Sequence, residues 1–417
     1  MDIKQEVLQK AQSAFAAAAA LRVAPDEQRN AALLAMAAKI RASVDEIKAA
    51  NQLDMKAGAE MGLSSAMLDR LKLTDSRIED MAVGLDQVAE FDDPIGEVLS
   101  ETVRPNGLNI QRISVPIGVI GIVYESRPNV TVDSAGLCIK SGNASLLRGG
   151  KEAVNSNICL AKMFAAACAE AGLPQGCVEI IESTDRQGVQ EMIRMDEYVS
   201  LIVPRGGHGL IRTVVENASV PVLKHDRGLC NIYVDASCDI QRAVPCINNA
   251  KTQRPGTCNA VENLWVHKDN IAALKAIVSD LQASGVEVRG TEAVCAVCEG
   301  VNPATEEDFD TEYLDMIISV DIVDSAEDAI ANIQKYSSGH SEAVFTDDAA
   351  VARKFLSEID SACLYHNAST RFTDGGQFGM GAEIGISTNR LHARGPVGIR
   401  ELTTYKYIGV GDYLSRK

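Results

Sequence analysis

The chain has 417 residues, of which 46% are hydrophobic and 23% charged, and its formal net charge is -17. This length allows two or three domains, each with a buried core, and argues against disorder. The excess of 57 acidic over 40 basic residues opposes the electrostatic attraction on which sequence-independent nucleic-acid binding depends. Nucleic acids and anionic membranes are therefore not expected as partners.

The N-terminal segment contains a run of five alanines, Ala16 to Ala20, that could suggest a signal peptide. Charged residues such as Lys4 and Lys10 interrupt its apolar core, so we predict a helix instead. No other uncharged stretch approaches the ~20 apolar residues of a membrane-spanning helix. We expect a soluble, cytoplasmic protein.

The eleven cysteines lie mostly inside apolar segments, which is typical of reduced, buried thiols. Cys295 and Cys298 form a CxxC pair, but no second pair or histidine cluster accompanies them. We therefore assign no metal site.

Residues 3–90 show helical periodicity, with Leu33 and Ile40 on one face of the pattern. Ser76 and Glu79 have the spacing of a capping box at the start of the last helix in this region. The N-terminal quarter of the chain is thus predicted to be entirely helical.

Segment 98–114 predicts two short strands around Pro105-Asn106-Gly107, a hairpin suited to a subunit contact. After Pro116, apolar strands alternate with helices, and a second series of the same kind starts near residue 230. Such alternation indicates parallel strands covered on both faces. The fold class is therefore α/β, with two doubly wound domains.

One cysteine, Cys258, departs from the apolar setting of the others, because it follows the turn-forming Pro255-Gly256 and lies near Arg254. A free thiol has a pKa of about 8.5, and a neighbouring cation increases its thiolate fraction. The pattern favours an exposed, activated thiol, with a structural thiol in a turn as the alternative.

Two strand-to-helix connections combine cations with flexible backbone. Gly142–Lys151 ends in Arg148 and Lys151, and Pro204–Gly209 contains Arg205 beside two glycines. Phosphate binds readily to such cations and to the N-terminus of a following helix, and ligands of open α/β sheets gather at the carboxyl ends of strands. Neither segment is a GxGxxG motif, so ordinary strand-to-helix turns remain the alternative.

Several long segments together resemble the glutamate-5-semialdehyde dehydrogenases, a branch of the aldehyde dehydrogenase superfamily. The likeness covers most of the chain from about residue 94 onward. It rests on the segments VPIGVIGIVYESRPNVTVDSAGLCIKSGNASLLRGGKEA, KTQRPGTCNA, YSSGHSEAVFT and NASTRFTDGGQFGMGAEIGISTNRLHARGPVGIRELTTYKY.

The resemblance implies an aldehyde dehydrogenase-like fold. It assigns residues 1–97 and 115–230 to an NADP-binding domain and residues 231–390 to a catalytic domain that carries the nucleophilic cysteine. Segments 98–114 and 391–417 then form a hairpin and a C-terminal segment through which a homo-oligomer assembles.

For the site, the resemblance implies that Cys258 is the nucleophile, with Asn129 or Arg127 holding the oxyanion. The implied cofactor-binding residues are Arg148, Lys151, Arg205, Gly206, Gly207 and Glu312, the last at the nicotinamide ribose. Lys151 stands where NAD-preferring relatives often have a glutamate. Because a cation attracts a 2′-phosphate that a carboxylate repels, NADP is expected as the cofactor.

The glutamate that activates water in hydrolytic relatives should fall at Lys224, where this chain has the run Lys224-His225-Asp226-Arg227. A cationic cluster suits the departure of phosphate, whereas a solvated charged turn is the alternative. Asp226 is only an offset candidate for a water-activating carboxylate. His340 fits the family signature, and Arg371 with Glu342 or Asp374 is expected to bind the charged groups of the substrate.

The activity implied is NADPH-dependent reduction of L-glutamyl 5-phosphate to L-glutamate 5-semialdehyde, with release of phosphate, in proline biosynthesis. The pathway also implies an association with the upstream glutamate 5-kinase. One alternative is a hydrolytic or CoA-acylating aldehyde dehydrogenase. Two others are a non-catalytic interaction protein with an inert thiol and a cysteine hydrolase with His225 or His208 as its base.

Overall fold

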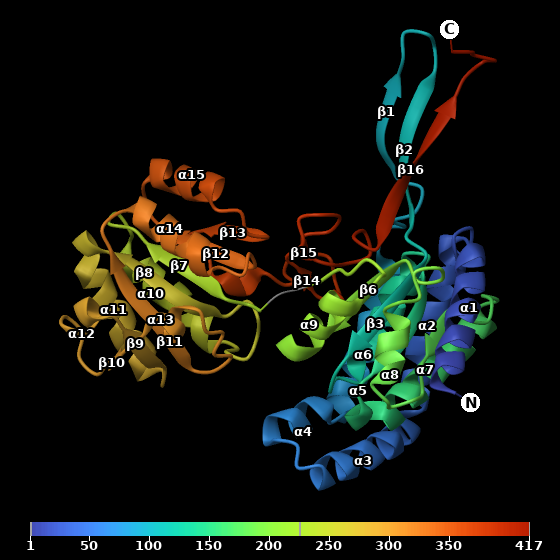
Figure 1. Ribbon diagram of the computed structural model, residues 1–417, viewed down its shortest axis with the longest axis horizontal. Coiled ribbons are helices and arrows are strands. Elements are labelled where there is room, and N and C mark those ends of the chain that lie inside the picture. The colour runs from blue at the N-terminus through green and yellow to red at the C-terminus, as the bar shows by residue number, and fades with distance from the viewer. Residues whose placement is uncertain (1, 225–226, 417) are drawn as a thin grey trace. The chain divides into compact units, whose positions relative to one another are not determined.

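The computed structural model describes residues 2–224 and 227–416, and the chain forms two compact units (Figure 1). The first unit comprises the described residues up to Lys224, together with Gly379–Gly385 and those from Val397 onward. The second unit runs from Arg227 to Phe378 and includes Ile386–Pro396. The C-terminal part of the chain therefore contributes to both units.

The first unit is rich in helices, and the predicted helical region before residue 90 is confirmed as five of them. The helices of this unit are α1 (Ile3–Leu21), α2 (Asp26–Ala42), α3 (Val44–Glu60), α4 (Ser65–Leu71), α5 (Asp75–Glu90), α6 (Asn129–Lys140), α7 (Val154–Glu170), α8 (Gln187–Met192) and α9 (His208–Asn217), with the 3-10 turn η1 (Lys151–Ala153). Leu33 and Ile40 are fully buried on α2, as their periodicity predicts.

The capping box predicted at Ser76 and Glu79 is wrong. Helix α5 begins at Asp75, and its N-cap is Thr74, whose hydroxyl accepts the N–H of Arg77. A threonine followed by an acidic residue satisfies the first-turn donors and the helix dipole together, so the helix starts two residues earlier than the pattern indicated.

A parallel sheet forms the centre of the first unit, in the order β5-β4-β3-β6. Its strands are β3 (Val119–Tyr124), β4 (Ala144–Gly149), β5 (Val178–Ile180) and β6 (Leu201–Arg205). Helices α6 and α7 pack on one face, while α1 contacts β3, β4 and β5 together with α8. Every residue of β3 is buried, as expected of a strand covered on both faces.

The predicted hairpin is confirmed as β1 (Val98–Val103) and β2 (Asn109–Pro116). The C-terminal strand β16 (Thr403–Val410) pairs with β2 along eight residues, which gives a three-stranded antiparallel sheet in the order β1-β2-β16. This sheet projects from the rest of the first unit (Figure 1). All six residues of β1 are exposed.

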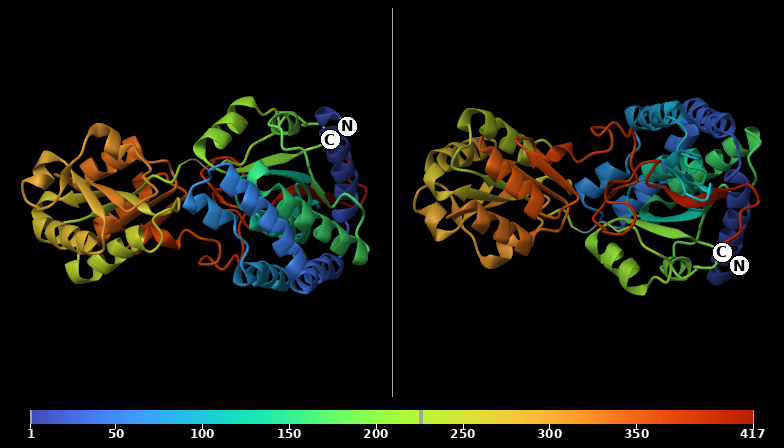
Figure 2. Two further views of the ribbon diagram at one scale, coloured as in Figure 1. Left: turned by 90° about the horizontal axis from the view of Figure 1, so that it is seen from below. Right: turned by 90° about the horizontal axis from the view of Figure 1, so that it is seen from above.

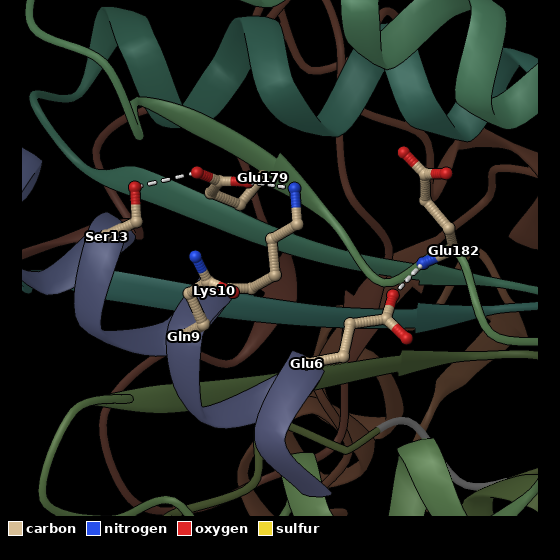
Figure 3. A pocket seen from close by; sticks show the side chains of 6 residues that line it. All are labelled: Glu6, Gln9, Lys10, Ser13, Glu179 and Glu182. Atoms are coloured by element: carbon tan, nitrogen blue, oxygen red, sulfur yellow. Dashed lines mark hydrogen bonds and ion pairs between the residues drawn. The ribbon is translucent and has the colours of Figure 1, made fainter. Parts of the chain in front are cut away.

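Helix α1 is joined to β5 and to the segment that follows it by three polar contacts around a surface pocket of about 510 Å³ (Figure 3). Lys10 Nζ donates to Glu179 at 2.8 Å, Ser13 Oγ donates to the same carboxylate at 2.7 Å, and the N–H of Glu182 donates to Glu6 at 2.7 Å. None of the predicted site residues lines this pocket. The polar side chains around the pocket hydrogen-bond to one another and to the backbone, so we assign them a structural role.

The second unit contains a seven-stranded parallel sheet in the order β10-β9-β11-β8-β7-β12-β13, covered by helices on both faces (Figure 2). Its strands are β7 (Cys230–Val234), β8 (Val261–His267), β9 (Glu287–Gly290), β10 (Asn302–Pro303), β11 (Ile317–Val323), β12 (Ser341–Phe345) and β13 (Cys363–His366), with the small antiparallel pair β14 (Ile386–Ser387) and β15 (Gly395–Pro396). Its helices are α10 (Ile240–Thr252), α11 (Ile271–Ala283), α12 (Glu292–Cys295), α13 (Glu306–Phe309), α14 (Ala326–Tyr336) and α15 (Ala349–Glu358), with the 3-10 turns η2 (Lys268–Asn270) and η3 (Thr370–Phe372). Both sheets confirm the predicted α/β class.

Trp265 anchors one of the two cores of the second unit. Its indole is 1% exposed, lies 5.1 Å from the ring of Phe309 and 5.9 Å from that of Tyr336, and donates to Asn231 Oδ1 at 3.1 Å. This stack joins β8 to α13 and α14, and the hydrogen bond joins β8 to β7.

Replacement of Trp265 by alanine is expected to destabilise the protein by about 3–5 kcal/mol, because it removes a buried aromatic ring and leaves a cavity. Trp265→Phe keeps an aromatic ring in the stack but loses the hydrogen bond and part of the buried ring, for which we expect a smaller loss of about 1–3 kcal/mol. Urea unfolding followed by circular dichroism measures both. Equal midpoints for wild type and Trp265→Ala would contradict the expectation.

Candidate active site

Four residues of the second unit lie at the amino ends of neighbouring strands. Gly228 precedes β7, Cys258 precedes β8, Glu312 precedes β11 and His340 precedes β12. These four strands are contiguous in the sheet, so their amino ends share one edge. Ligands of open parallel sheets usually bind at the opposite, carboxyl edge. The candidate thiol site of this unit thus lies at the less common edge.

Cys258 lies in the loop between α10 and β8 and is partly buried. Arg371 crosses this loop: its Nε donates to Gln253 Oε1 at 2.8 Å, and its Nη1 donates to Thr257 Oγ1 at 3.1 Å and to Asn259 Oδ1. Its charge interacts with that of Cys258, and burial lowers the pKa of the guanidinium. Since α10 presents its C-terminus to the loop, cations supply the favourable potential for a thiolate.

Gly228 touches the backbone of Cys258 directly. A Cβ atom at position 228 would lie 1.9 Å from the carbonyl oxygen of Cys258 and 2.3 Å from its Cα, so only glycine fits. Cys230, two residues later, donates its thiol to the same carbonyl oxygen at 3.2 Å. Burial raises the pKa of the Cys230 thiol well above its usual range. The loop is thereby held from one side by a close backbone contact and a neutral thiol.

Glu312 is joined to this arrangement through Gly228, whose N–H donates to Glu312 Oε1 at 2.7 Å. Two residues further on, Leu314 adopts a positive φ of 53°, a conformation that costs a residue with a side chain about 1–3 kcal/mol. The N–H of Leu314 donates to Glu262 Oε1 at 3.3 Å. The turn that carries Glu312 is therefore a fixed feature of the unit.

His340 and Glu342 were expected to contact the substrate, but both side chains are fully buried. Glu342 accepts the N–H of Asn231 at 2.6 Å and the hydroxyls of Ser337 and Ser361, and burial raises its pKa to about 7. Its carboxylate ties β12 to β7 inside the unit. A substrate ammonium group cannot reach it in this arrangement.

Asp374, the other carboxylate expected at the substrate, is engaged in a turn of its own. Its Oδ1 accepts the N–H of Gly376 at 2.9 Å and the N–H of Gln377 at 3.2 Å. The preceding residue, Thr373, holds the thiol loop, since its carbonyl oxygen accepts Asn259 Nδ2 at 2.9 Å. Segment 371–374 therefore supports the loop of Cys258 at several points.

In the first unit, the predicted cofactor residues lie at the carboxyl edge of the sheet. Tyr124, the last residue of β3, pairs with Gly149 on β4 and with Arg205 on β6. The chain leaves β3 toward β4 on one side, and it leaves β6 toward Val222, which forms a parallel bridge with Ile202 on the other side. The shared end of β3 and β6 is therefore a topological switch point. The loops that follow these three strands meet at this edge.

A carboxylate that the sequence did not reveal lies at this switch point. Glu125 Oε2 accepts the N–H of Gly207 at 2.8 Å, at the N-terminus of α9. A Cβ atom at Gly206 would lie 2.4 Å from the same oxygen. Glycine at 206 thus makes room for the Glu125 carboxylate, which occupies one of the donors expected to bind phosphate.

A second unpredicted carboxylate, Glu152, fixes the loop after β3. Its Oε1 accepts the N–H of Ser126 at 2.6 Å and the hydroxyl of the same residue at 2.8 Å. Ser126 has a positive φ of 44°, and a Cβ atom at Gly150 would lie 2.1 Å from Glu152 Oε1. The strained loop conformation and the glycine are both explained by the position of this carboxylate.

Asn129, the expected oxyanion donor, is the first residue of α6, and its Nδ2 donates to Asp133 Oδ2 at 2.8 Å. Burial raises the pKa of Asp133 to about 6, while the hydrogen bond from Asn129 and the charge of Arg205 lower it. Arg205 lies over Gly385, since a Cβ atom there would meet Arg205 Nη1 at 2.8 Å. Asp133 therefore orients one N–H of Asn129 and leaves the second for another acceptor.

Arg148 and Lys151 have different surroundings. Arg148 is 7% exposed and donates to the carbonyl oxygens of Gly149, Thr184 and Asp185, each at 2.9 Å. This differs from the phosphate contact expected of it, because the guanidinium is turned toward the chain. Lys151 is exposed at the start of η1 and forms no ion pair with residues 2–224 or 227–416. It is the better cation for a ligand phosphate.

The remaining predicted site residues lie in two places along the chain, after β3 and at the junction between the two units. Arg127 is exposed after β3, and Lys224 is partly buried at the end of the first unit. His225 and Asp226 lie outside the described residues. Arg227 forms an ion pair with Asp310.

The eleven cysteines are free thiols, and Cys258 is one of four that are only partly buried. Among the residues that the structure describes, no group of three His, Cys, Asp or Glu side chains is arranged to hold a metal ion. No helix in the described ranges is long and apolar enough to cross a membrane.

The model of the family described as the aldehyde dehydrogenase family matches residues 2–290. A gamma-glutamyl phosphate reductase of Thermotoga maritima is 52% identical over 414 residues, covering 99% of this chain and all of the relative. The chain belongs to the gamma-glutamyl phosphate reductase branch of the aldehyde dehydrogenase family. A relative of the same name from Moorella thermoacetica is 52% identical over 99% of both chains.

Solved structures of this family agree with the fold. The crystal structure of the Thermotoga maritima gamma-glutamyl phosphate reductase matches with a TM-score of 0.97 at 52% identity, covering 99% of this chain and all of that one. An acetylating aldehyde dehydrogenase from Geobacillus thermoglucosidasius matches with a TM-score of 0.70 at 18% identity, covering all of this chain and 98% of that one. At that identity the second match shows the aldehyde dehydrogenase fold alone.

Proposed function

We propose that this chain reduces L-glutamyl 5-phosphate to L-glutamate 5-semialdehyde, with NADPH as the reductant and release of phosphate, in proline biosynthesis. The observation that carries the proposal is the match at 52% identity over 99% of the chain to gamma-glutamyl phosphate reductases. The thiol loop supports it, because an acyl phosphate is an electrophile suited to a cysteine nucleophile. We assign the reaction to the cytoplasm, where it would follow the reaction of glutamate 5-kinase in the pathway.

Cys258 begins the reaction as a thiolate, favoured by the charges of Arg371 and Arg254. Its sulfur attacks the acyl carbon, the carbonyl electrons move to the oxygen, and their return expels phosphate to leave a thioester. Bound NADPH supplies the hydride that reduces this thioester. Collapse of the resulting hemithioacetal then returns the electron pair to sulfur and frees the aldehyde.

The developing oxyanion needs donors that are already oriented before the reaction. We assign this role to the second N–H of Asn129, which Asp133 holds in the donor orientation. Arg127 and Lys224 are proposed to neutralise the departing phosphate, together with His225. Arg371 keeps a supporting role beside its expected contact with the substrate carboxylate, because its donors also hold the thiol loop.

The residues of the first unit fit a nicotinamide dinucleotide at the carboxyl edge of its sheet. Lys151 offers an exposed cation, and the N-terminus of α9 offers backbone donors for a diphosphate. Binding there requires Glu125 to release the N–H of Gly207, since a carboxylate and a phosphate repel each other. Arg148 and Arg205 support the neighbouring loops, and Glu312 is assigned to the nicotinamide ribose.

Reversal of charge at Lys151 tests the cofactor assignment. We expect Lys151→Glu to raise the Kd for NADPH about 10- to 100-fold, because a carboxylate repels the 2′-phosphate, and to change the Kd for NADH little. Titration of the dinucleotide fluorescence gives both constants. Lys4→Glu, the same charge change on α1, is the matched control, and an equal effect of both variants on NADPH would count against the assignment.

The three-stranded sheet supports a homo-oligomer. Tyr405 and Tyr407 are 50% and 65% exposed on β16, and Val98 and Val103 are 51% and 68% exposed on the edge strand β1. Apolar side chains on an unpaired edge favour contact with a second copy of the chain. Light scattering is expected to give a multiple of 44.6 kDa for wild type.

Substitution of the exposed tyrosines of β16 tests whether this sheet forms the contact between copies of the chain. Tyr405→Glu/Tyr407→Glu is expected to reduce the particle mass to 44.6 kDa, because charge on this face disfavours its burial. Leu53→Glu, at an exposed apolar residue of α3, is the control and should keep the mass of wild type.

The decisive experiment runs the reaction backward with purified protein, L-glutamate 5-semialdehyde and NADP, and varies the acyl acceptor. Reduction of NADP that requires phosphate supports the proposed function. Turnover with water alone or only with coenzyme A would instead establish the hydrolytic or CoA-acylating alternative. Absence of turnover with any acceptor would reopen the substrate assignment.

A further inference from the structure

A buried ion pair closes the base of the loop that carries Cys258. Lys251, in the last turn of α10, donates to Glu262 Oε2 on β8 at 2.7 Å, and both side chains are 0% exposed. Burial raises the pKa of Glu262 to about 7 and lowers that of Lys251, whereas their mutual attraction opposes both changes. Because a buried ion pair is often no more stabilising than apolar side chains of the same volume, its presence here calls for another reason.

The second oxygen of Glu262 reaches a different segment. Its Oε1 accepts the N–H of Leu314, whose backbone has a positive φ although the residue is not glycine. The exposed side chain of Leu314 contributes little burial to offset this conformation, since it is 45% exposed. The hydrogen bond to Glu262 is therefore an internal support for the turn that follows Glu312.

From this turn the contacts return to the nucleophile. Glu312 accepts the N–H of Gly228, and Gly228 lies against the backbone of Cys258 without room for a side chain. The contacts thus form a closed circuit through Lys251, Glu262, the 312–314 turn and Gly228, and back to the loop of Cys258. A shift at the ion pair changes both the turn and the loop.

We propose that Lys251 and Glu262 are positioning residues that fix the 312–314 turn against the Cys258 loop, so that the ribose-binding carboxylate and the thiol are held in one geometry. This inference rests on the proposed function, because it takes Glu312 as the ribose ligand. Neither residue touches the reacting atoms in the proposal. Their effect is on cofactor affinity and on the reactivity of the thiol.

The test compares variants that separate fold stability from positioning. Glu262→Gln keeps an acceptor for Leu314 and loses the charge that pairs with Lys251. The double variant Lys251→Met/Glu262→Met replaces the whole pair by apolar side chains and also removes the acceptor for Leu314. Because replacement of a whole buried ion pair is often neutral, we expect a stability near that of wild type. Asp93→Asn, which removes the charge that pairs with buried Arg29 in the first unit, is the matched control.

Three quantities are measured for each full-length variant: the thermal midpoint, the Kd for NADPH by fluorescence titration, and the rate at which iodoacetamide alkylates Cys258 without cofactor. For the double variant we expect an unchanged midpoint, a Kd raised about tenfold, as for the loss of one charge-assisted hydrogen bond, and an altered alkylation rate. Glu262→Gln should lie between wild type and the double variant in Kd. Asp93→Asn should change the midpoint alone.

A double variant with wild-type Kd and alkylation rate would overturn the inference and leave the pair with a packing role only. If the double variant does not fold, Lys251→Met/Glu262→Gln, which keeps an acceptor for Leu314 and leaves no buried charge unpaired, decides by the same two readouts. Failure of the wild-type protein to bind NADPH is a different result, because it contradicts the proposed function rather than the positioning role.

Discussion

Cys258→Ser is expected to lower kcat by at least about 10³-fold, because a serine hydroxyl does not ionise near neutral pH, whereas a thiol does so in part. The measurement is phosphate-dependent reduction of NADP with L-glutamate 5-semialdehyde. The Kd for NADPH should stay within about twofold of wild type, since the change affects the chemical step.

The matched control for this prediction is Cys246→Ser. Cys246 is also partly buried and belongs to α10, the helix that precedes the thiol loop. It should keep the activity of wild type. If Cys258→Ser retains a tenth or more of the wild-type kcat, Cys258 is not the nucleophile, and a thioester at Cys258 is ruled out.

Gly228→Ala is expected to lower kcat about 10²-fold or more. The new methyl group would lie 1.9 Å from the carbonyl oxygen and 2.4 Å from the carbonyl carbon of Cys258. These are backbone atoms, so the loop itself must shift, and a displacement of ~1 Å at a reacting group costs about this much. Because the N–H of Gly228 also holds Glu312, the Kd for NADPH should rise in the same variant.

The control for this substitution is Gly84→Ala on α5, where a Cβ atom would meet no other atom within 4 Å. That change should be neutral or slightly stabilising, since alanine is the better helix former. Thermal midpoints for both variants show whether Gly228→Ala acts through loss of fold or through geometry. An active Gly228→Ala protein would mean that the loop has room that this structure does not contain.

The strand and helix pattern of both units could be predicted because a parallel strand that is buried on both faces usually has an uninterrupted run of apolar residues in the sequence. Strand β3 is of this kind, β7 is apolar except for Asn231, and all residues of both strands are buried. Short strands such as β9 and β10 carry no apolar run and alternate or end in polar residues. These short strands form because they pair with neighbouring strands, so the local sequence does not predict them.

The nucleophile was recognisable from its own segment, whereas its support was not. Pro255, Gly256 and Arg254 mark the turn around Cys258, but Arg371 comes from more than a hundred residues later along the chain. Contacts at such separation follow from the sheet order and leave no trace in the local sequence. Gly228 is similar, because its need for a missing side chain becomes visible only when Cys258 lies beside it.

Charged residues showed the clearest limit of sequence reasoning. Arg148 ends a strand beside glycines, a pattern that suggests a ligand phosphate, yet its guanidinium donates to carbonyl oxygens of the chain. Glu342 could have been assigned to the interior from the sequence, since it lies within an apolar strand of a parallel sheet. Glu125 and Glu152 lie beside the segments predicted to bind phosphate, and nothing in the local sequence indicates that their carboxylates accept N–H groups of the neighbouring loops.

The fluorescence of Trp265 can be used to follow the unfolding of one unit of the protein. The chain has one tryptophan, and it lies in the second unit. Indole emission in the folded and unfolded protein therefore reports on that unit alone, whereas circular dichroism reports on both. If the two signals change at different urea concentrations, the units unfold separately, and the order in which the two units unfold can be measured on the native chain without any label.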